Sequence, residues 1–259
     1  MNIAVITGAS SGIGYEFATQ IERKHKLDEI WLIARRKEQL ERLSKSLHTQ
    51  TRILCCDLTD EASFTEYKQL LSSIKPNIKY LFNAAGYGEM GDYEEIALKV
   101  QMNMIDLNVK ALVRMSVLSI PYMKKGAKIL QMGSESVFTP LPYFNIYAST
   151  KSFVKHYSKG LYYELKPKGI TVTVVCPGWV RTEFFNHTKD NAVKRSPKAY
   201  KPMLEAKGVV ALAIKDADNG KSMSVCGAYT KLHHAISKIA PEPCLINTWL
   251  GLLKEKDKQ

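Results

Sequence analysis

Residues 3–14 read Ile3-Ala4-Val5-Ile6-Thr7-Gly8-Ala9-Ser10-Ser11-Gly12-Ile13-Gly14, and this stretch decides the fold. The four apolar residues at its start predict a buried strand. The glycines at positions 8, 12 and 14 allow a sharp turn, and the apolar residues at 13, 17 and 21 predict a helix after it. The N-terminus of such a helix offers free N–H groups and the positive end of its dipole. The stretch therefore predicts a site for an anion such as a pyrophosphate.

The spacing of these glycines, G-x-x-x-G-x-G, differs from the G-x-G-x-x-G fingerprint of dinucleotide-binding proteins. Ordinary surface loops have a similar composition, so a plain loop is the alternative interpretation. A preceding strand and a following helix are the context that a phosphate-binding turn requires. We therefore favour the anion site.

Short β-rich runs alternate with amphipathic segments along the chain. The predicted strands are residues 3–6, 30–34, 52–55, 80–83, 128–132, 171–176 and 222–226. The predicted helices are residues 14–24, 37–47, 61–74, 98–120, 147–165 and 205–216. Asp60 is placed to cap the third helix, and Gly169 to end the fifth. The alternation predicts an α/β protein with a doubly wound parallel sheet, which binds ligands at the carboxyl ends of its strands.

The composition of the chain limits its class and location. Its 259 residues, 45% of them hydrophobic, are enough for a single α/β domain spanning residues 1–259. The five cysteines are odd in number and form no C-x-x-C pair, which predicts reduced thiols and a cytoplasmic protein. The best candidate for a membrane span, residues 107–123, carries Lys110 and Arg114, so we expect no span. Because strand residues begin at once, we also expect no signal peptide.

The net charge of +12 is compatible with a nucleic acid, an anionic membrane or an anionic small molecule as partner. The 29 lysines are scattered along the chain rather than gathered in a stripe. This pattern favours a solvated basic surface, and we expect no nucleic-acid partner. The densest basic stretch, residues 189–201, lies in a segment, 183–204, that we expect to form a lid over the site.

Small or polar residues follow five of the predicted strands, as a ligand site at their carboxyl ends requires. These residues are Ala34-Arg35-Arg36, Asp57-Leu58, Asn83-Ala84-Ala85-Gly86, Gly133-Ser134 and Pro177-Gly178. Strands commonly end in turn residues, so one such ending carries no information. The agreement of five endings with one predicted cleft supports the site.

The end of the second strand discriminates between two dinucleotides. An NAD site usually has an acidic residue about twenty positions after the glycines, which binds the ribose 2′-hydroxyl. Here that position is Ala34, and Arg35 and Arg36 follow. A guanidinium binds a 2′-phosphate through paired, charge-assisted hydrogen bonds, whereas a carboxylate repels it. The sequence predicts NADP(H), with Arg35 as the main contact and Arg36 as a secondary one; the alternative is that both arginines only begin a solvated helix.

Tyr147 and Lys151 are four residues apart on a predicted helix and therefore share one face. A nearby ammonium is expected to lower the pKa of the phenol toward working pH, as a proton donor to a carbonyl requires. By chance, about 1.5 such tyrosine–lysine pairs are expected in a chain of this composition. A second pair, Tyr162 and Lys166, does occur, but the serine thirteen positions before it, Ser149, lies about 20 Å away along the same helix. Ser134 instead follows a strand, so the first pair is the catalytic candidate.

In this order and spacing, several motifs resemble the short-chain dehydrogenase/reductase family over about residues 2–182. They are Thr-Gly-x-x-x-Gly-x-Gly at 7–14, Asn-x-Ala-Gly at 83–86, Asn108, Ser134, Tyr147-x-x-x-Lys151 and Pro177-Gly-x-x-x-Thr182. The resemblance implies a Rossmann-like three-layer αβα sandwich with seven parallel strands in the order 3-2-1-4-5-6-7. It also implies a homodimer or homotetramer and the NADP-preferring pattern at Arg35.

The resemblance implies roles for individual residues. Tyr147 would be the general acid/base, Lys151 would lower its pKa and hold the nicotinamide ribose, Ser134 would orient the substrate oxygen, and Asn108 would support a proton-relay water. The implied cofactor contacts, besides Tyr147 and Lys151, are Gly8, Ser10, Ser11, Gly12, Ile13, Gly14, Arg35, Arg36, Asp57, Leu58, Asn83, Gly86, Pro177, Gly178, Val180 and Thr182.

The chain departs from the family pattern in two places. Ala84 replaces the second asparagine of Asn-Asn-Ala-Gly, and Ser134 lies in Gly-Ser-Glu-Ser rather than a Ser-Ser pair. Ser136 is therefore a weaker candidate for the polarising hydroxyl. Beyond residue 182 the resemblance thins, and the end of the chain is similar to the bacterial subgroup related to the DltE-type reductases.

The expected function is reduction of a ketone or aldehyde by NADPH, or the reverse reaction, without a metal. Within this class, a 3-oxoacyl thioester reductase and a hydroxysteroid dehydrogenase are alternatives; outside it, the alternative is a dinucleotide-binding regulator without catalysis. Phe184 and Phe185 are the expected apolar contacts of a small-molecule substrate. For the helical extension at 229–255, and for residues 244–253 in particular, we weigh subunit or core packing against a membrane-surface helix.

Overall fold

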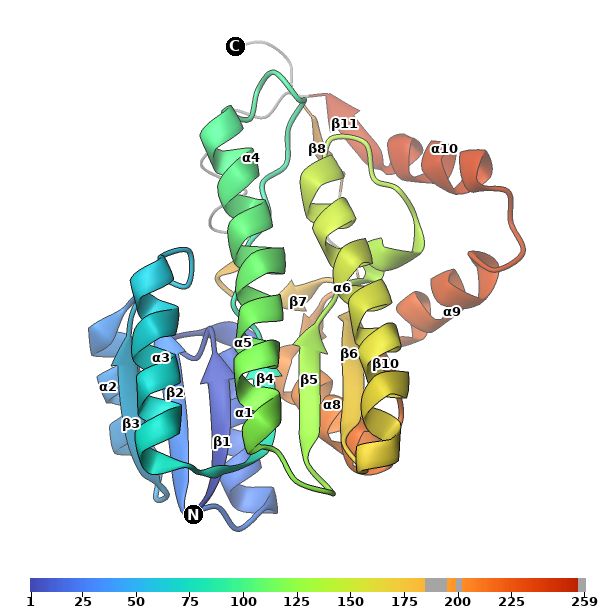
Figure 1. Cartoon of the computed structure of the whole chain (residues 1–259). Helices are drawn as coiled ribbons and strands as arrows, with labels where there is room; N and C mark the ends of the chain where they lie inside the picture. The colour runs from blue at the N-terminus through green and yellow to red at the C-terminus, as the bar shows by residue number, and fades with distance from the viewer. Residues whose placement is uncertain (185–194, 199–201, 256–259) are drawn as a thin grey trace.

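A parallel sheet of seven strands forms the centre of the computed structural model, which describes residues 1–184, 195–198 and 202–255 (Figure 1). The strands are β1 (Asn2–Thr7), β2 (Glu29–Ala34), β3 (Gln50–Cys55), β4 (Asn77–Asn83), β5 (Lys128–Met132), β6 (Thr171–Pro177) and β10 (Met223–Cys226). Their spatial order is β10-β6-β5-β4-β1-β2-β3, and every pairing is parallel. The predicted order 3-2-1-4-5-6-7 is confirmed, with β10 as the seventh strand.

Helices cover both faces of the sheet, because successive residues of each strand point to opposite sides. Ala4 and Ile6 of β1 pack in one apolar cluster with residues of α1 (Gly12–Lys24), α2 (Lys37–Ser46) and α8 (Ala206–Asp218). Ile3 and Val5 pack in a second cluster with residues of α3 (Glu61–Ile74), α5 (Leu112–Ser119) and α6 (Asn145–Leu165). The result is the expected three-layer sandwich.

The prediction of one regular helix over residues 98–120 is wrong. The structure has α4 (Leu98–Ile105), a wider π-helical segment at Asp106–Ala111, then α5 and a short 3-10 turn at Ile120–Tyr122. Apolar spacing does not reveal such a segment. Its physical cause lies in tertiary contacts at Asn108, described below.

Helix ends agree partly with the sequence signals. Asp60 precedes α3, but its side chain makes no capping hydrogen bond. Gly169 ends a 3-10 turn that follows α6, in the left-handed conformation at φ 69°. Glycine suits this position because it lacks a Cβ and adopts a positive φ without steric cost.

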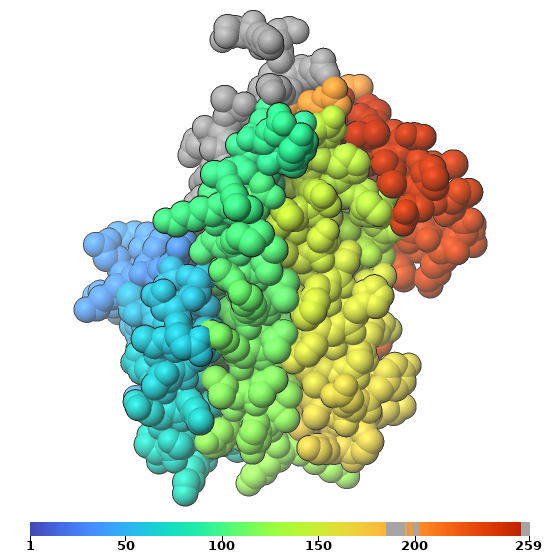
Figure 2. Space-filling view, turned by 45° about the horizontal axis from the view of Figure 1, so that its top comes forward, coloured from blue at the N-terminus to red at the C-terminus, as the bar shows by residue number. Residues whose placement is uncertain are grey.

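The last part of the chain lies outside the three layers. Helices α9 (Ala228–Ile236) and α10 (Glu242–Leu252) stand beyond the carboxyl ends of β5, β6 and β10 (Figure 1). In Figure 2 these two helices are coloured red and protrude beside helix α6. Two small sheets complete this region: β7 (Val180–Arg181) pairs with β9 (Leu204–Glu205), and β8 (Arg195–Pro197) pairs with β11 (Leu253–Glu255). Across the described ranges, every helix is too short or too polar to cross a membrane.

We predict that Phe17→Ala lowers the free energy of unfolding by about 3–5 kcal/mol, measured by urea denaturation. Phe17 of α1 is fully buried, and its ring centroid lies 4.3 Å from that of Phe82 on β4. The matched control is Tyr93→Ala, a similar truncation at a side chain that is 78% exposed, which should cost less than about 0.5 kcal/mol. Equal effects of the two variants would show that the interface between α1 and the sheet is not a core.

Candidate active site

One cavity of about 990 Å³ opens at the carboxyl ends of the central strands. It unites residues that are far apart in the sequence, because parallel strands end at the same edge of a sheet. Of the predicted site residues, those that line it are Gly8, Ser10, Ser11, Gly12, Ile13, Gly14, Arg35, Arg36, Asp57, Leu58, Gly86, Ser134, Tyr147, Lys151, Pro177, Gly178, Val180, Thr182 and Phe184. Phe185 and most of the expected lid, 183–204, lie outside the described residues.

The glycine turn forms one wall of the cavity, where backbones approach too closely for side chains. A Cβ on Gly8, which has φ +67°, would lie 2.8 Å from the amide nitrogen of Ala85. A Cβ on Gly14 would collide with the carbonyl oxygen of Gly8. The Thr7 hydroxyl accepts hydrogen bonds of 3.1 Å from the amides of Ala84 and Ala85, which fixes the end of β1 against the end of β4. The start of α1 is thereby held open toward the cavity, as an anion site requires.

Two guanidinium groups lie at the side of the cavity near β2. Arg36 donates to the Ser10 hydroxyl at 3.3 and 3.2 Å and pairs with the Glu183 carboxylate at 2.8 Å. Arg35 pairs with Asp57 at 3.4 Å, and its side chain is 66% exposed. Burial raises the pKa of Asp57, but hydrogen bonds from Thr59 and the charge of Arg35 outweigh this effect and lower it. Both guanidinium groups therefore lie in the cavity wall, each paired with a carboxylate, and Arg36 also contacts the turn at Ser10.

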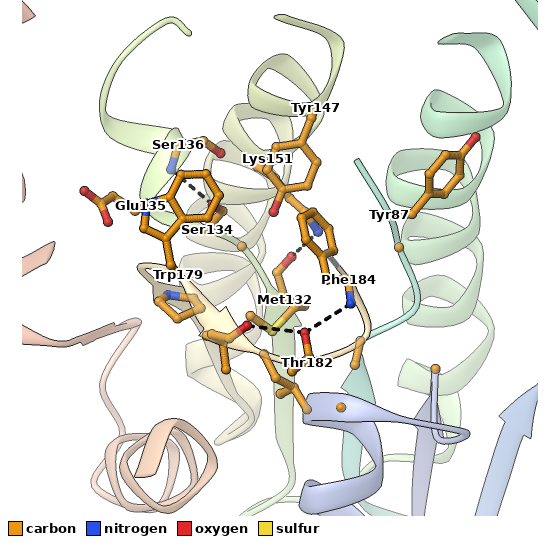
Figure 3. Close-up of a pocket in the computed structure, with 18 of the residues that line it drawn as sticks. Tyr87, Met132, Ser134, Glu135, Ser136, Tyr147, Lys151, Trp179, Thr182 and Phe184 are labelled. Atoms are coloured by element: carbon orange, nitrogen blue, oxygen red, sulfur yellow. Dashed lines mark hydrogen bonds between the residues drawn. The ribbon is translucent and has the colours of Figure 1, made fainter. Parts of the chain in front are cut away.

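Tyr147 and Lys151 project from α6 into the middle of the cavity, near Ser134 at the end of β5 (Figure 3). The Tyr147 ring stacks on Phe144 with centroids 4.3 Å apart, and Phe184 lies 5.5 Å away on another side. The Lys151 ammonium donates to the carbonyl oxygen of Met132 at 2.8 Å and lies 5.6 Å from the Tyr147 ring centroid. Both side chains are buried, so their positions are fixed by packing as well as by polar contacts.

Burial dominates the protonation of both groups. It raises the pKa of Tyr147 to about 12, although a hydrogen bond with the Ser134 side chain acts in the opposite direction. It lowers the pKa of Lys151 to about 8. The sequence predicted a lowered pKa for Tyr147, but these protein groups raise it. Desolvation of the phenolate raises the pKa by more than the polar neighbours of Tyr147 lower it.

The two predicted asparagines lie behind the cavity wall rather than in it. Asn108, in the π-helical segment, accepts from the Tyr87 amide at 3.1 Å and donates to the Tyr87 carbonyl and the Thr150 hydroxyl. A Cβ on Gly86 would lie 2.7 Å from its side-chain oxygen. Asn83 donates to Gln131 and Ser116 beneath the strand ends. Asn108 thus supports the loop of Gly86 and Tyr87 that faces the cavity, whereas Asn83 joins β4 to β5 and α5.

Ser134 and Ser136 both line the cavity. The Ser134 hydroxyl accepts from the Ser136 amide at 3.2 Å, which orients it at the start of the short helix Glu135–Phe138 (Figure 3). Tyr162 and Ser149, the competing tyrosine and serine, are not among the lining residues. Tyr162 donates to the Gly220 carbonyl instead.

Sequence reasoning missed the wall that the end of the chain contributes. Helices α9 and α10 supply the lining residues Tyr229, Leu232, His233, Ile236, Leu245, Thr248, Trp249 and Leu252. The first four of these residues lie on α9 and the last four on α10. In both helices they have the spacing i, i+3, i+4, i+7, which marks one face of a helix. That signal was present in the sequence, but spacing alone does not tell a cavity wall from core, subunit or membrane packing.

A family model described as short chain dehydrogenase matches residues 2–192. Over 229 residues the chain is 31% identical to very-long-chain 3-oxoacyl-CoA reductase-A of Danio rerio, which covers 84% of this chain and 69% of that protein. It is also 31% identical over 209 residues to the very-long-chain 3-oxoacyl-CoA reductase of Homo sapiens, covering 76% of this chain and 65% of the relative. The chain thus spans about two thirds of the length of these relatives.

Solved structures resemble nearly the whole chain. A short-chain dehydrogenase from Sphingobium yanoikuyae in complex with NADPH has a TM-score of 0.77 and 27% sequence identity. The likeness covers 97% of this chain and 95% of that one.

We predict that Lys151→Met changes how stability depends on pH. The folded pKa of Lys151 is about 8, against an ordinary value of 10.5, so the unfolded chain binds more protons at this position between these pH values. The contribution of Lys151 to stability therefore rises with pH in this window. The free energy of unfolding of Lys151→Met minus that of the wild type should fall across it, by up to about 1.4 kcal/mol per pH unit.

Urea denaturation of both proteins at several pH values between about 7 and 10 measures this difference. Lys168→Met, at an exposed position just after α6, is the control and should leave the difference constant. A constant difference for Lys151→Met as well would mean that the Lys151 ammonium is not desolvated.

Proposed function

Because the chain belongs to the short-chain dehydrogenase family, we propose that it is an NADP(H)-dependent oxidoreductase that reduces a ketone or aldehyde to an alcohol. The observation that carries this proposal is that one cavity contains the glycine turn, the two arginines and the group Ser134, Tyr147 and Lys151. The first two features suit a phosphorylated dinucleotide, and the third suits proton transfer to a carbonyl oxygen.

The residues present fit NADPH. Gly8 and Gly14 lie against neighbouring backbone, so only glycine permits the close turn that presents the N-terminus of α1 to the cavity, where a pyrophosphate would bind. The guanidinium of Arg35 is exposed at the end of β2 and would bind the 2′-phosphate, with Arg36 beside it. Ser10, Ser11, Gly12 and Ile13 would line the pyrophosphate, Asp57 and Leu58 the adenine, and Gly86, Pro177, Gly178, Val180 and Thr182 the nicotinamide half. Bound NADPH supplies the hydride.

Tyr147 would act as the general acid. With a pKa of about 12 its phenol is protonated at neutral pH, which is the state that reduction of a carbonyl requires. As hydride adds to the carbonyl carbon, the Tyr147 proton moves to the carbonyl oxygen and leaves a phenolate. The nearby Lys151 ammonium would stabilise this phenolate, and the Ser134 hydroxyl would hold the carbonyl oxygen toward Tyr147. Asn108 would position Tyr87 and Thr150 behind this group.

A 3-oxoacyl thioester is a narrower candidate for the substrate. It is favoured by the printed names of the relatives from Danio rerio and Homo sapiens, which are very-long-chain 3-oxoacyl-CoA reductases. The matched region spans about two thirds of the length of these relatives and includes Ser134, Tyr147 and Lys151 of this chain.

We also propose that the enzyme is a homodimer or homotetramer. Apolar side chains are exposed on α5 at Val117 and on α6 at Phe153 and Tyr163, and a contact between subunits would cover them. A cytoplasmic location stays a prediction.

We predict that Tyr147→Phe lowers the rate of carbonyl reduction to about 1% of the wild type or less, because a general acid typically contributes about 100-fold or more to the rate. The rate is followed as NADPH consumption with a panel of acyl thioesters, steroids, sugars and aromatic aldehydes. NADPH affinity, measured by fluorescence titration, should stay close to that of the wild type. Tyr162→Phe, the same change outside the cavity, is the control. A Tyr147→Phe enzyme with near-normal turnover contradicts the proposed acid, and a wild type inactive on the entire panel favours a non-catalytic regulator.

We predict that Arg35→Asp shifts cofactor preference from NADPH toward NADH by at least about tenfold in kcat/KM, because a carboxylate repels the 2′-phosphate. Arg42→Asp makes the same charge change at an exposed position of α2 that is not part of the cavity wall, and should leave the preference intact. Unchanged selectivity in Arg35→Asp would exclude Arg35 as the discriminating contact.

A further inference from the structure

Glu135 stands where the chain departs from the family pattern, in Gly-Ser-Glu-Ser, directly after the candidate serine Ser134. Its carboxylate points away from Tyr147 (Figure 3), so it is not aimed at the reacting carbonyl itself. The Glu135 side chain is only 18% exposed. A carboxylate is costly to bury unless polar groups surround it, so the partners of Glu135 indicate what it does.

Both carboxylate oxygens of Glu135 contact residues of α9. One oxygen lies 2.8 Å from Nδ1 of His233, and the other accepts a hydrogen bond of 3.2 Å from the Thr230 hydroxyl. The family model ends at residue 192, before α9 begins. The partners of Glu135 therefore lie outside the part of the chain that the family model matches.

The His233 imidazole bridges the two ends of the short turn that follows Ser134. This 3-10 turn runs from Glu135 to Phe138, and Thr139 comes directly after it. Nδ1 of His233 contacts Glu135 at the first end, and Nε2 lies 2.9 Å from the Thr139 hydroxyl at the other end. The internal hydrogen bonds of a 3-10 turn have poor geometry, so contacts with α9 are well placed to fix its position.

The hydroxyl of Ser134 depends on the position of this turn. Ser134 is the residue at which the turn begins, and its hydroxyl accepts from the Ser136 amide at 3.2 Å. The same hydroxyl forms a hydrogen bond with Tyr147, the candidate acid. A shift of the turn would move the hydroxyl relative to the phenol, and a displacement of about 1 Å in a reacting group lowers a rate by up to about 100-fold.

Glu135 also joins the turn to the end of β6. A Cβ on Gly178 would lie 2.8 Å from the Glu135 carboxylate and 2.7 Å from the Thr230 hydroxyl, so both side chains pack directly against the glycine backbone. Gly178 is among the residues that would line the nicotinamide half of the cofactor. The contacts of Glu135 thus connect the turn of Ser134 with the side of the cavity where the hydride donor would lie.

Resting on the function proposed above, we propose that Glu135 and His233 are positioning residues for the reaction. They hold the turn after Ser134 so that its hydroxyl meets the carbonyl oxygen beside Tyr147. Neither residue gives a proton to the substrate. Their effect on the rate passes through Ser134, which separates this role from a general contribution to stability.

The test is a cycle of substitutions, followed as NADPH consumption with the fastest-reacting carbonyl compound of the panel given above. Glu135→Ala should lower kcat by about 10- to 100-fold and keep the affinity for NADPH close to that of the wild type, because the turn loses its contacts with α9. In a Ser134→Ala background the same substitution should have no further effect on kcat, since effects that act through one group are not additive. Single-turnover measurements at high enzyme concentration keep these low rates measurable.

Glu135→Gln is the conservative variant and a second readout. Its amide can still accept from Thr230 and donate to Nδ1 of His233, so most of the loss in kcat should be recovered. Glu22→Ala is the matched control: Glu22 of α1 has a side chain only 6% exposed, pairs with His48 and is not in the cavity wall. This control should lower the free energy of unfolding in urea but keep the wild-type kcat.

Thr139→Val removes only the hydroxyl at the other end of the turn, so it tests the same contacts if Glu135→Ala does not fold. It should lower kcat and lose this effect in the Ser134→Ala background. The inference is overturned if Glu135→Ala keeps the wild-type kcat, if its loss persists undiminished without the Ser134 hydroxyl, or if Glu22→Ala loses kcat to the same extent. A wild type that consumes no NADPH with any compound of the panel overturns the proposed function instead, and this inference with it.

Discussion

The close approach of three backbone segments at the end of β1 is the constraint on which the site depends. Gly8 faces the amide of Ala85, and Gly14 faces the carbonyl of Gly8, with no room for a side chain at either position. The Thr7 hydroxyl joins the same segments by bonding two amides of the β4 loop. This contact aims the N-terminus of α1 at the cavity and sets the loop of Gly86 against Asn108 and Lys151. The anion site and the catalytic candidates therefore share one rigid support.

Desolvation is the second constraint. It raises the pKa of Tyr147 and lowers the pKa of Lys151. Both shifts favour the neutral form, since burial removes water from whichever form is charged. A protonated phenol suits donation to a carbonyl. The stacking of Phe144 and the contact with Phe184 exclude water from the same place, so packing and acid–base chemistry are not separable here.

Much of the fold follows from sequence because strands in a parallel sheet are short, apolar and regularly spaced. For the same reason the strand ends at Arg35, Asp57, Ser134 and Gly178 could be assigned to one cleft. The π-helical segment at Asn108 could not be predicted from sequence. Asn108 makes its contacts in this segment with Tyr87 and Thr150, which are distant in sequence. The direction of the Tyr147 pKa shift was also missed, because spacing identifies the neighbouring lysine but not the degree of burial.

The cavity wall formed by α9 and α10 could not be predicted from sequence either. His233 and Glu135 are 98 residues apart, and no local pattern predicts their contact. The i, i+3, i+4, i+7 spacing of α9 and α10 indicated an apolar face but not what it covers. Only the arrangement of these helices around one cavity connects them with Tyr147.

The most direct test of the central claim follows the hydride itself. The purified chain is incubated with a straight-chain ketone and NADPH deuterated at the transferable position of nicotinamide C4, and the product is analysed by mass spectrometry. The account predicts an alcohol that carries deuterium on the former carbonyl carbon. An absence of alcohol, or an alcohol without deuterium at that carbon, would contradict it.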